Sequence, residues 1–495
     1  MMGLTAYALD PSSDLVDQVL PSGSFSDGTL DLRLLSQANY SFSDPTSAQN
    51  LTFDIINPSD TSMPLYLAQY TDGEWSVIDS LGSIGPGKTL HIKYPVDFSY
   101  TGKPSETDTF GVIGETPSGY VGKIFVIGED WTTYESYLRS WLSIGGVIVA
   151  TAMLFTLLIV MGGVIAVAAR TKHEELAGEG EYTFWTLFFP LMRTRPMAEK
   201  IADIIITPWF WAVEALFGAV LVLIVLLITI TMIPSDIGVM VFLIGGVCAI
   251  FMPLIFLVIG WLADYYERDP FRFLFAMFMW GVMVTFAAFL LNTTLDLFIS
   301  LILGSTLASL ATAVLVAPVV EESSKGFGLL IMAGHHEMDD MFDGILYGFA
   351  IGMGFAAIEN WLYFAANANP VSVEGLTPWA FNILYRSVLC SLAHGGFTAA
   401  TGGVIGFMKS KKSLRKFAFL GYFLGLPIAI ILHASFNFTA ILDEIMQMFL
   451  SFPVPVFDPM LTLGMTGIYI ILGVILQLKL GKRLKSQQQP FEPGG

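Results

Sequence analysis

Two adjacent glutamates, Glu321 and Glu322, lie in the run ATAVLVAPVVEESSKGFGLLIMAG, whose other residues are typical of a membrane-spanning helix. An ionised carboxylate is costly in hydrocarbon, and two neighbouring carboxylates do not both ionise easily. Lys325 follows Glu321 at the i, i+4 spacing, so an ion pair within the helix can keep one carboxylate charged. Polar groups at such a depth usually line a pathway or do chemistry, which makes this pair the first candidate for a site.

Three further apolar runs carry isolated polar residues. Glu359 lies in GFAAIENWLYF, His394 in SLAHGGF, and both His433 and Asn437 in ILHASFNF. The last two are spaced i, i+4 and share one helix face. At a rise of ~1.5 Å per residue, Glu321, Glu359 and the two histidines lie roughly 18 to 24 Å from one end of their spans. We therefore expect them at one level of a hydrocarbon core that is ~30 Å thick.

The same residues also have a purely structural interpretation. A single membrane histidine is more often an interhelical hydrogen-bond partner than a catalyst, and a Glu–Lys pair can be a clamp. The glycines of GILYGFAIGMGF are small packing positions that let helices approach closely and would bring Glu359 near its partners. Arg386 and Asp343 can simply anchor helix ends near an interface. Three glutamates and two histidines at one depth nevertheless favour chemistry.

The composition is that of an integral membrane protein with some soluble mass, since 54% of the 495 residues are hydrophobic and only 13% are charged. Apolar segments begin at Trp141, and each is near or above the ~20 residues needed to cross a bilayer. We predict nine spans, at about 141–169, 209–233, 237–263, 271–293, 297–333, 343–366, 379–408, 417–447 and 459–480. The fifth and eighth are long enough to be tilted or broken, and Pro318 is a candidate break in the fifth.

The distribution of basic residues predicts the orientation. With the N-terminus outside, 16 of the 24 Lys and Arg residues fall in cytoplasmic loops and in the C-terminal tail. We therefore expect a multi-pass cell-membrane protein with its N-terminus outside and its C-terminus in the cytoplasm. The layer of polar side chains then lies between the midplane and the outer leaflet.

Residues 1–138 are predicted to form an extracytoplasmic β-sandwich, because runs such as LTFDII, LYLAQY and TLHIKYPV alternate with turn clusters such as NPSDTS. Most of the net charge of −18 lies here, which argues against binding nucleic acid or anionic lipid. The fold class is thus a polytopic α-helical membrane protein of about nine helices with an N-terminal β domain. The membrane part divides into 139–263 with the first three spans, a core at 264–445, and the last span and tail at 446–495.

The motifs YYERDPFRFLFAMFMWG, APVVEESSKGFGLL, FDGILYGFAIGMGFAAIENWLY, AHGGFTAATGGVIG and LHASFNF follow one another over roughly residues 260–440. This succession resembles the PrsW family of intramembrane proteases, and the order EExxK, FxxxEN, H and HxxxN is its specific part. That family belongs with the CAAX prenyl endopeptidases in a wider superfamily of glutamate-dependent membrane proteases. By this resemblance the matched active-site positions are Glu321, Glu322, Glu359, His394, His433 and Asn437.

The resemblance implies a peptidase that acts on a membrane-anchored protein, in some family members an anti-sigma factor, and cuts near its membrane segment. The implied partners are that substrate and the lipid bilayer, with no nucleic acid. CAAX processing is disfavoured, because prenylated tails approach from the cytoplasm whereas the expected site lies in the outer half of the bilayer.

Peptide hydrolysis needs a water nucleophile, a base that activates it and a donor for the developing oxyanion. We expect Glu321 or Glu322 to take the proton from water, and His433 with Asn437 to polarise the scissile carbonyl. The third glutamate and the other histidine would position the water or the leaving amine. No serine or cysteine is suitably placed beside a histidine at this depth, which argues against covalent catalysis.

This mechanism predicts no cofactor, but three alternatives remain. Glu and His from separate helices can build a zinc site without an HExxH motif. Its ligands would be Glu321, Glu359, His394 and His433. A proton-coupled transporter would use the same residues as a relay, although no inverted repeat of hydropathy or motif supports transport. A receptor would sense a signal through the N-terminal domain.

Overall fold

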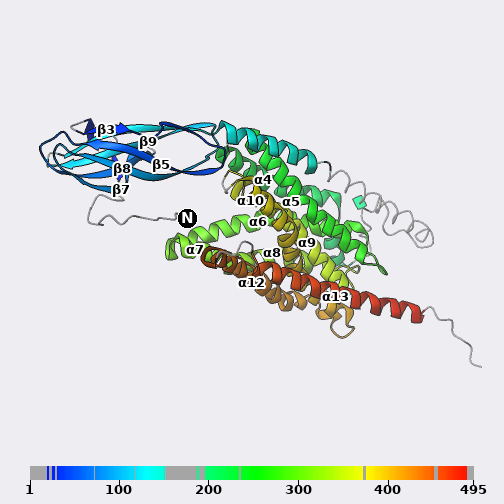
Figure 1. The fold of residues 1–495 in the computed structure, drawn as a ribbon. Coiled ribbons are helices and arrows are strands. Elements are labelled where there is room, and N and C mark those ends of the chain that lie inside the picture. The colour runs from blue at the N-terminus through cyan, green and yellow to red at the C-terminus, as the bar shows by residue number, and fades with distance from the viewer. Residues whose placement is uncertain are drawn as a thin grey trace, which may run out of the picture. The chain divides into compact units, whose positions relative to one another are not determined.

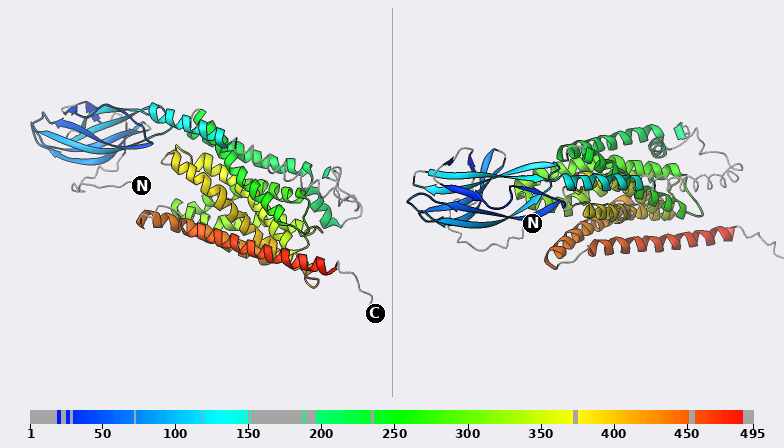
Figure 2. Two further views of the ribbon diagram at one scale, coloured as in Figure 1. Left: turned by 45° about the vertical axis from the view of Figure 1, so that its right-hand side comes forward. Right: turned by 45° about the horizontal axis from the view of Figure 1, so that its top comes forward.

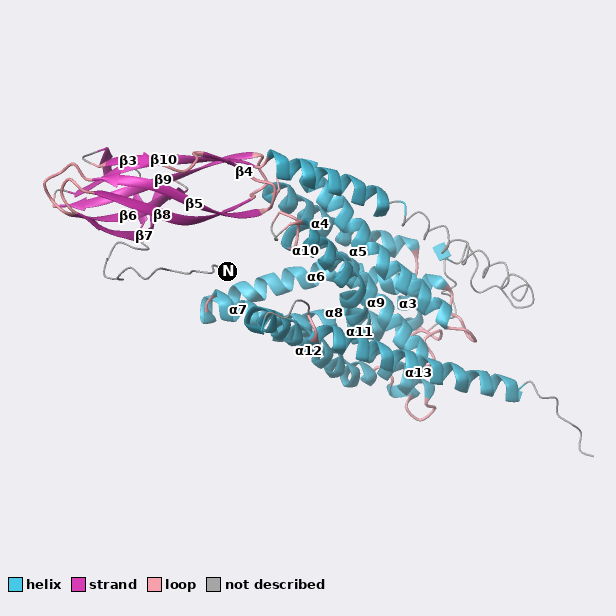
Figure 3. Ribbon diagram, viewed as in Figure 1, coloured by secondary structure: helices cyan, strands magenta, loops and turns pink. Residues whose placement is uncertain are grey.

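The computed structural model describes two compact units, Met1–Trp141 with Pro370–Leu376, and Leu142–Asn369 with Thr377–Gly495 (Figure 1). The residues it does not describe are 1–18, 22–24, 28–29, 72, 118, 150, 152–186, 189–195, 234–235, 372–374, 451–454 and 488–495. Most of the first predicted span, 141–169, and of the loop 170–208 therefore lies outside the described residues. Figure 3 shows that strands make up the first unit and helices the second.

The N-terminal unit is β-rich, as predicted. Its strands are β1 (Val19–Pro21), β2 (Phe25–Asp27), β3 (Asp31–Leu34), β4 (Asn39–Ser41), β5 (Thr46–Ile56), β6 (Met63–Thr71), β7 (Glu74–Ile84), β8 (Thr89–Ser99), β9 (Ser105–Thr116) and β10 (Gly119–Asp130). They form a seven-stranded sheet in the order β1-β7-β6-β9-β10-β2, with β4 also paired to β10, and a second sheet in the order β3-β5-β8.

The two sheets pack face to face through alternate residues of their strands. Leu51, Phe53 and Ile55 on β5 are fully buried, as the period-two pattern of a strand with one buried face requires. The Phe53 ring lies 5.3 Å from the ring of Phe125 on β10, in the other sheet. This aromatic contact joins the two sheets of the sandwich.

One carboxyl group inside the sandwich is perturbed. Glu129 on β10 is buried, and its Oε2 accepts a 2.9 Å hydrogen bond from Nε1 of Trp131. Burial, together with the negative charges of Asp108 and Glu106, raises the pKa of Glu129 to about 7, against the smaller opposing effect of the Trp131 hydrogen bond. The sandwich therefore contains a group that titrates near neutral pH.

The second unit is helical. After a helical segment at 132–149, its α-helices are α3 (Met197–Ile205), α4 (Pro208–Met232), α5 (Asp236–Ala263), α6 (Phe271–Leu303), α7 (Ser305–Ala311), α8 (Ala317–Met332), α9 (Met341–Leu362), α10 (Leu376–Tyr385), α11 (Ser391–Ser410), α12 (Leu420–Leu450) and α13 (Phe457–Gln487). Short irregular turns interrupt them: the π-helical η1 (Thr312–Val316), η2 (Tyr363–Asn367) and η3 (Arg386–Cys390), and the 3₁₀ turn η4 (Arg415–Phe417).

Eight helical segments among the described residues are long and apolar enough to cross a membrane. They coincide with the second to ninth predicted spans, and the chain is an integral multi-pass membrane protein. Figure 2 shows these helices running side by side, with α13 at the edge of the bundle in both views. The count of nine rests on the first predicted span, which lies largely outside the described residues.

The predicted end of the fourth span at residue 293 is wrong. Helix α6 continues to Leu303, and the hydroxyls of Thr293 and Thr294 are satisfied inside it by donating to the carbonyls four residues earlier. The helix ends at Gly304, whose φ of +78° only glycine adopts readily. Pro318 does not break the fifth span, because it lies in the first turn of α8, where its missing N–H is tolerated.

Glycines bring α9 close to its neighbours, as their spacing predicts. A Cβ at Gly344 would be 2.1 Å from a backbone oxygen of Gly402 on α11, and one at Gly352 would be 2.3 Å from that of His394. On another face of α9, a Cβ at Gly354 would be 1.9 Å from a backbone oxygen of α6. These backbones touch only because no side chain separates them. The contact at Gly352 lies two turns before Glu359 on the same helix.

Candidate active site

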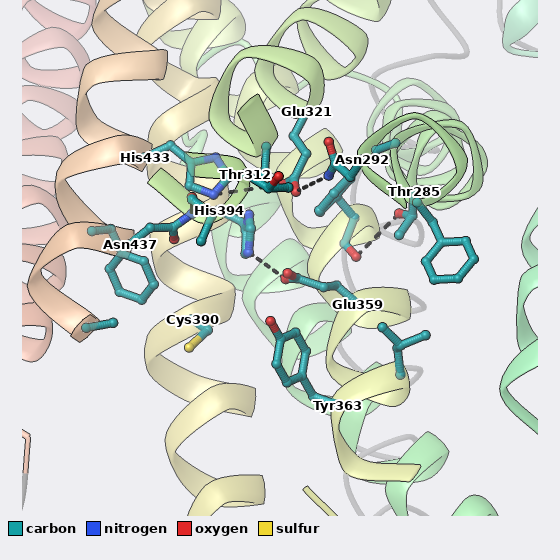
Figure 4. A pocket seen from close by; sticks show the side chains of 18 of the residues that line it. Thr285, Asn292, Thr312, Glu321, Glu359, Tyr363, Cys390, His394, His433 and Asn437 are labelled. Atoms are coloured by element: carbon teal, nitrogen blue, oxygen red, sulfur yellow. Dashed lines mark hydrogen bonds and ion pairs between the residues drawn. The ribbon is translucent and has the colours of Figure 1, made fainter. Parts of the chain in front are cut away.

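The polar residues of several membrane helices face one cavity of about 490 Å³. Helices α6, α8, α9, α11 and α12 and the turns η1, η2 and η3 contribute to its wall. Figure 4 shows Glu321, Glu359, His394, His433 and Asn437 pointing into the same space. Five of the six predicted site residues thus line this cavity.

The sixth, Glu322, is enclosed within the bundle. Its Oε1 accepts hydrogen bonds from Lys325 Nζ at 2.8 Å and from His433 Nδ1 at 3.0 Å. Its Oε2 accepts one from the Thr398 hydroxyl at 2.9 Å. With three donors and no exposed side-chain surface, Glu322 is a buried anchor for its neighbours and has no access to the cavity.

Glu321 has fewer hydrogen-bond donors around its carboxylate than Glu322 has. Its Oε1 accepts a 3.2 Å hydrogen bond from Asn292 Nδ2 on α6. Its Oε2 has no hydrogen-bond donor among the described residues and lies 3.5 Å from Lys325 Nζ and 3.9 Å from His433 Nε2. The predicted Glu321–Lys325 ion pair is therefore the looser of the two that Lys325 makes. A buried carboxylate oxygen without a donor is costly, so it marks a place for water, substrate or an ion.

Glu359 and His394 form a close pair across the α9–α11 contact. His394 Nε2 lies 2.7 Å from Glu359 Oε2, and His394 Nδ1 lies 3.1 Å from Lys325 Nζ. Because a lysine ammonium only donates, Nδ1 acts as the acceptor and the ring proton is on Nε2. The proton-bearing Nε2 is therefore the atom in close contact with Glu359 Oε2, an oxygen that accepts no well-aligned hydrogen bond from a described residue.

His433 and Asn437 share one face of α12, as their spacing predicts, but they have different partners. His433 Nδ1 donates to Glu322, which leaves the lone pair of Nε2 on the cavity side. Asn437 Nδ2 donates to the Ala313 carbonyl in η1 at 2.7 Å. In this arrangement Asn437 ties α12 to a π-helical turn, and Nε2 of a neutral His433 accepts rather than donates.

Residues 269–464 match the family model described as "PrsW family intramembrane metalloprotease". The predicted resemblance to the PrsW family is confirmed. The matched segment contains all six predicted site residues, and no solved structure matches the chain.

Three curated proteins named "Protease PrsW" are each similar to part of this chain. The one from Geobacillus kaustophilus (strain HTA426) is 31% identical over 134 residues, which are 26% of this chain and 56% of that protein. The one from Shouchella clausii (strain KSM-K16) is 33% identical over 129 residues, 26% of this chain and 54% of that protein. The one from Bacillus subtilis (strain 168) is 28% identical over 181 residues, 36% of this chain and 74% of that protein. The chain spans about half the length of the first two relatives.

The segment 269–464 also holds a set of side chains that fits a metal ion. Glu321, His394 and His433 each offer one ligand atom, and these atoms lie within 4.8 Å of one another. One carboxylate and two imidazoles are a usual zinc donor set, and Glu321 Oε2 accepts no hydrogen bond from a described residue. Glu322 holds His433 through Nδ1, as carboxylates commonly do for metal-binding histidines. Of the four predicted ligands, Glu359 is outside this group.

Sequence reasoning missed several residues that shape the cavity. Asn292 begins the polar run NTTLD, which by its composition predicts the end of a span and gives no sign of a site. Thr398, which follows His394 at the i, i+4 spacing, does not line the cavity itself but donates from its hydroxyl to the buried Glu322. Arg386 and Cys390 both line the cavity through the turn η3. Cys390 makes no hydrogen bond to a described residue.

Proposed function

We propose that the chain is an intramembrane endopeptidase that hydrolyses peptide bonds of a membrane-anchored protein. The observation that carries this proposal is Glu321, whose Oε2 accepts no hydrogen bond from a described residue and lies inside a helical bundle beside the cavity and His433. A carboxylate in that position can take a proton from a water molecule in the cavity. The relatives named "Protease PrsW" support the same activity.

Glu321 rather than Glu322 is the base in this proposal. Asn292 holds Oε1 and leaves Oε2 for the water, whereas Glu322 already accepts three hydrogen bonds. The water oxygen attacks the scissile carbonyl carbon as its proton passes to Glu321. His433 Nε2, kept as an acceptor by Glu322, orients the remaining O–H of the water.

The carbon–nitrogen bond can break only if the leaving amine gains a proton. His394 Nε2 lies 2.7 Å from Glu359 Oε2 at the cavity wall. We propose that Glu321 passes the proton it took from water to the amine, which balances the step, while Glu359 and His394 position the amine. The Gly352 contact between α9 and α11 keeps the pair in place.

A metal-dependent form of the same activity is the second candidate, favoured by the three ligand atoms within 4.8 Å of one another. Glu321, His394 and His433 would hold the ion. A bound zinc ion would make water more acidic and polarise the scissile carbonyl. Glu322 would keep His433 in the tautomer that presents Nε2.

The distribution of basic residues supports an N-terminus outside the cell and a C-terminus in the cytoplasm. With this orientation we propose that the cavity lies in the outer half of the bilayer, and that the substrate is cut near its own membrane segment.

Membrane proteomes of cells that make the wild-type chain or the Glu321→Gln variant should be compared by N-terminal peptide mapping. We expect new N-termini of membrane-anchored proteins only with the wild type. The matched control is Glu444→Gln, which changes an exposed glutamate on α12 and should behave as wild type. If no N-terminus depends on Glu321, the proposal fails.

Elemental analysis and a chelator test on purified protein distinguish the metal-dependent from the metal-free form of the activity. In the metal-dependent form, elemental analysis finds zinc in the wild type and less in Glu321→Gln, and a chelator stops cleavage. In the metal-free form, the chelator has no effect while Glu321→Gln still abolishes cleavage.

A further inference from the structure

Arg386 is fixed in the wall of the cavity by contacts on several sides. Its guanidinium carbon lies 3.5 Å from the centroid of the Tyr363 ring. Its Nε donates to Asn360 Oδ1 at 3.2 Å, and its Nη2 lies 3.5 Å from Glu359 Oε2. A guanidinium stacked on a ring and bound through one edge has lost most of its rotational freedom before any ligand arrives.

The main chain of Arg386 is held as firmly as its side chain. Its carbonyl accepts a hydrogen bond from Asn360 Nδ2 at 3.1 Å and a longer one, 3.4 Å, from the Ser391 hydroxyl. Asn360 therefore binds both ends of the residue. The π-helical turn η3, which begins at Arg386, places the side chain on the cavity side of the helix.

Arg386 still has hydrogen-bonding capacity to offer. Its Nη1 has no partner among the described residues, and 16% of the side chain remains exposed. The nearby Lys325 is fully enclosed, with Glu322 and His394 as partners. Among the described residues that line the cavity, Arg386 is thus the cation that a ligand can reach.

A peptide that enters this cavity loses the water that solvated its backbone. Each carbonyl oxygen left without a donor then costs free energy. The two asparagines on the cavity wall already donate elsewhere, Asn292 to Glu321 and Asn437 to the Ala313 carbonyl. The guanidinium of Arg386 is a strong and preorganised donor beside Glu359.

We propose that Arg386 binds a backbone carbonyl oxygen of the substrate next to the scissile bond. This inference rests on the proposed peptidase activity and deepens it by adding a substrate-binding residue. The competing explanation is that Arg386 only balances the charge of Glu359. The two differ in kinetics: a contact made in both the ground state and the transition state changes KM, whereas a misplaced Glu359 changes kcat.

The probe is the membrane-anchored protein whose new N-terminus depends on Glu321 in the peptide-mapping experiment, purified and labelled on both sides of the cut. Arg386→Gln should lower kcat/KM by about 10- to 100-fold, mainly through a higher KM. Arg386→Lys keeps the charge beside Glu359 but loses the planar fork, so it should also raise KM. The control is Arg415→Gln, in an exposed turn, which should match the wild type.

Arg386→Lys keeps the test decisive if Arg386→Gln does not fold. A fall in kcat with KM unchanged, or no change in either constant, overturns the inference. These results leave the proposed function intact, because that function stands or falls with Glu321→Gln. An inactive wild type, or an active Glu321→Gln variant, would instead remove the proposed function itself.

Discussion

Replacing Gly352 by alanine should separate Glu359 from His394 without removing a polar group. Gly352 lies on α9, two turns before Glu359, at the contact with α11. A Cβ there would be 2.3 Å from the carbonyl oxygen of His394 and 2.5 Å from Gly395 Cα, both backbone atoms that cannot rotate away. Ordinary contacts of such an atom begin near 3.4 Å, so the two helices must move apart by about 1 Å.

The size of the effect follows from that displacement. The Glu359–His394 contact, 2.7 Å in the structure, would lengthen to about 3.7 Å, beyond hydrogen-bonding range. A misplacement of ~1 Å at a catalytic group costs about 10²-fold in rate. Overpacking of this kind also lowers the free energy of unfolding by about 1–3 kcal/mol.

The matched control is Gly467→Ala on α13, where a Cβ would meet no atom within 4 Å. Because alanine favours a helix over glycine by about 1 kcal/mol, this variant should be as stable as the wild type or slightly more so. Cleavage of the Glu321-dependent substrate and unfolding in a detergent titration measure both effects. Wild-type cleavage by Gly352→Ala, or an equal loss in Gly467→Ala, would refute the reasoning.

Three further predictions concern other buried groups. Lys325→Met leaves the enclosed carboxylate of Glu322 without its ammonium partner. The free energy of unfolding in a detergent titration should therefore fall by about 3–5 kcal/mol, and an unchanged value would contradict this. Cys390→Ala should keep most of the cleavage activity, and its inactivity would point to covalent catalysis. Since the pKa of Glu129 rises from 4.5 to about 7 on folding, its stabilising contribution is complete below pH 4.5 and is lost as the pH rises through about 7. Hydrogen exchange in β9 and β10 should show this loss in the wild type and a flatter profile in Glu129→Gln; identical profiles would argue against it.

The helical spans were largely predictable, because crossing a membrane requires a length and an apolar composition that can be read locally. The C-terminal end of α6 is an exception to this local reading of length and composition. Thr293 and Thr294 look like the end of a span in the sequence, yet α6 continues to Leu303 and their hydroxyls bond to the helix backbone. Whether a polar run ends a helix depends on where its hydrogen bonds go, which composition does not reveal.

The sequence by itself determined which ionisable side chains stand at one depth, because the rise per residue of a helix is nearly constant. It could not distinguish Glu321 from Glu322. Neighbouring residues on a helix point about 100° apart, so the rotation of α8 against its neighbours decides which one faces the cavity. The tertiary structure turns Glu321 towards the cavity and buries Glu322 against Lys325 and His433. The same packing brings Arg386 to the site, because a π-helical turn and its hydrogen bonds to a neighbouring helix set the direction of that side chain.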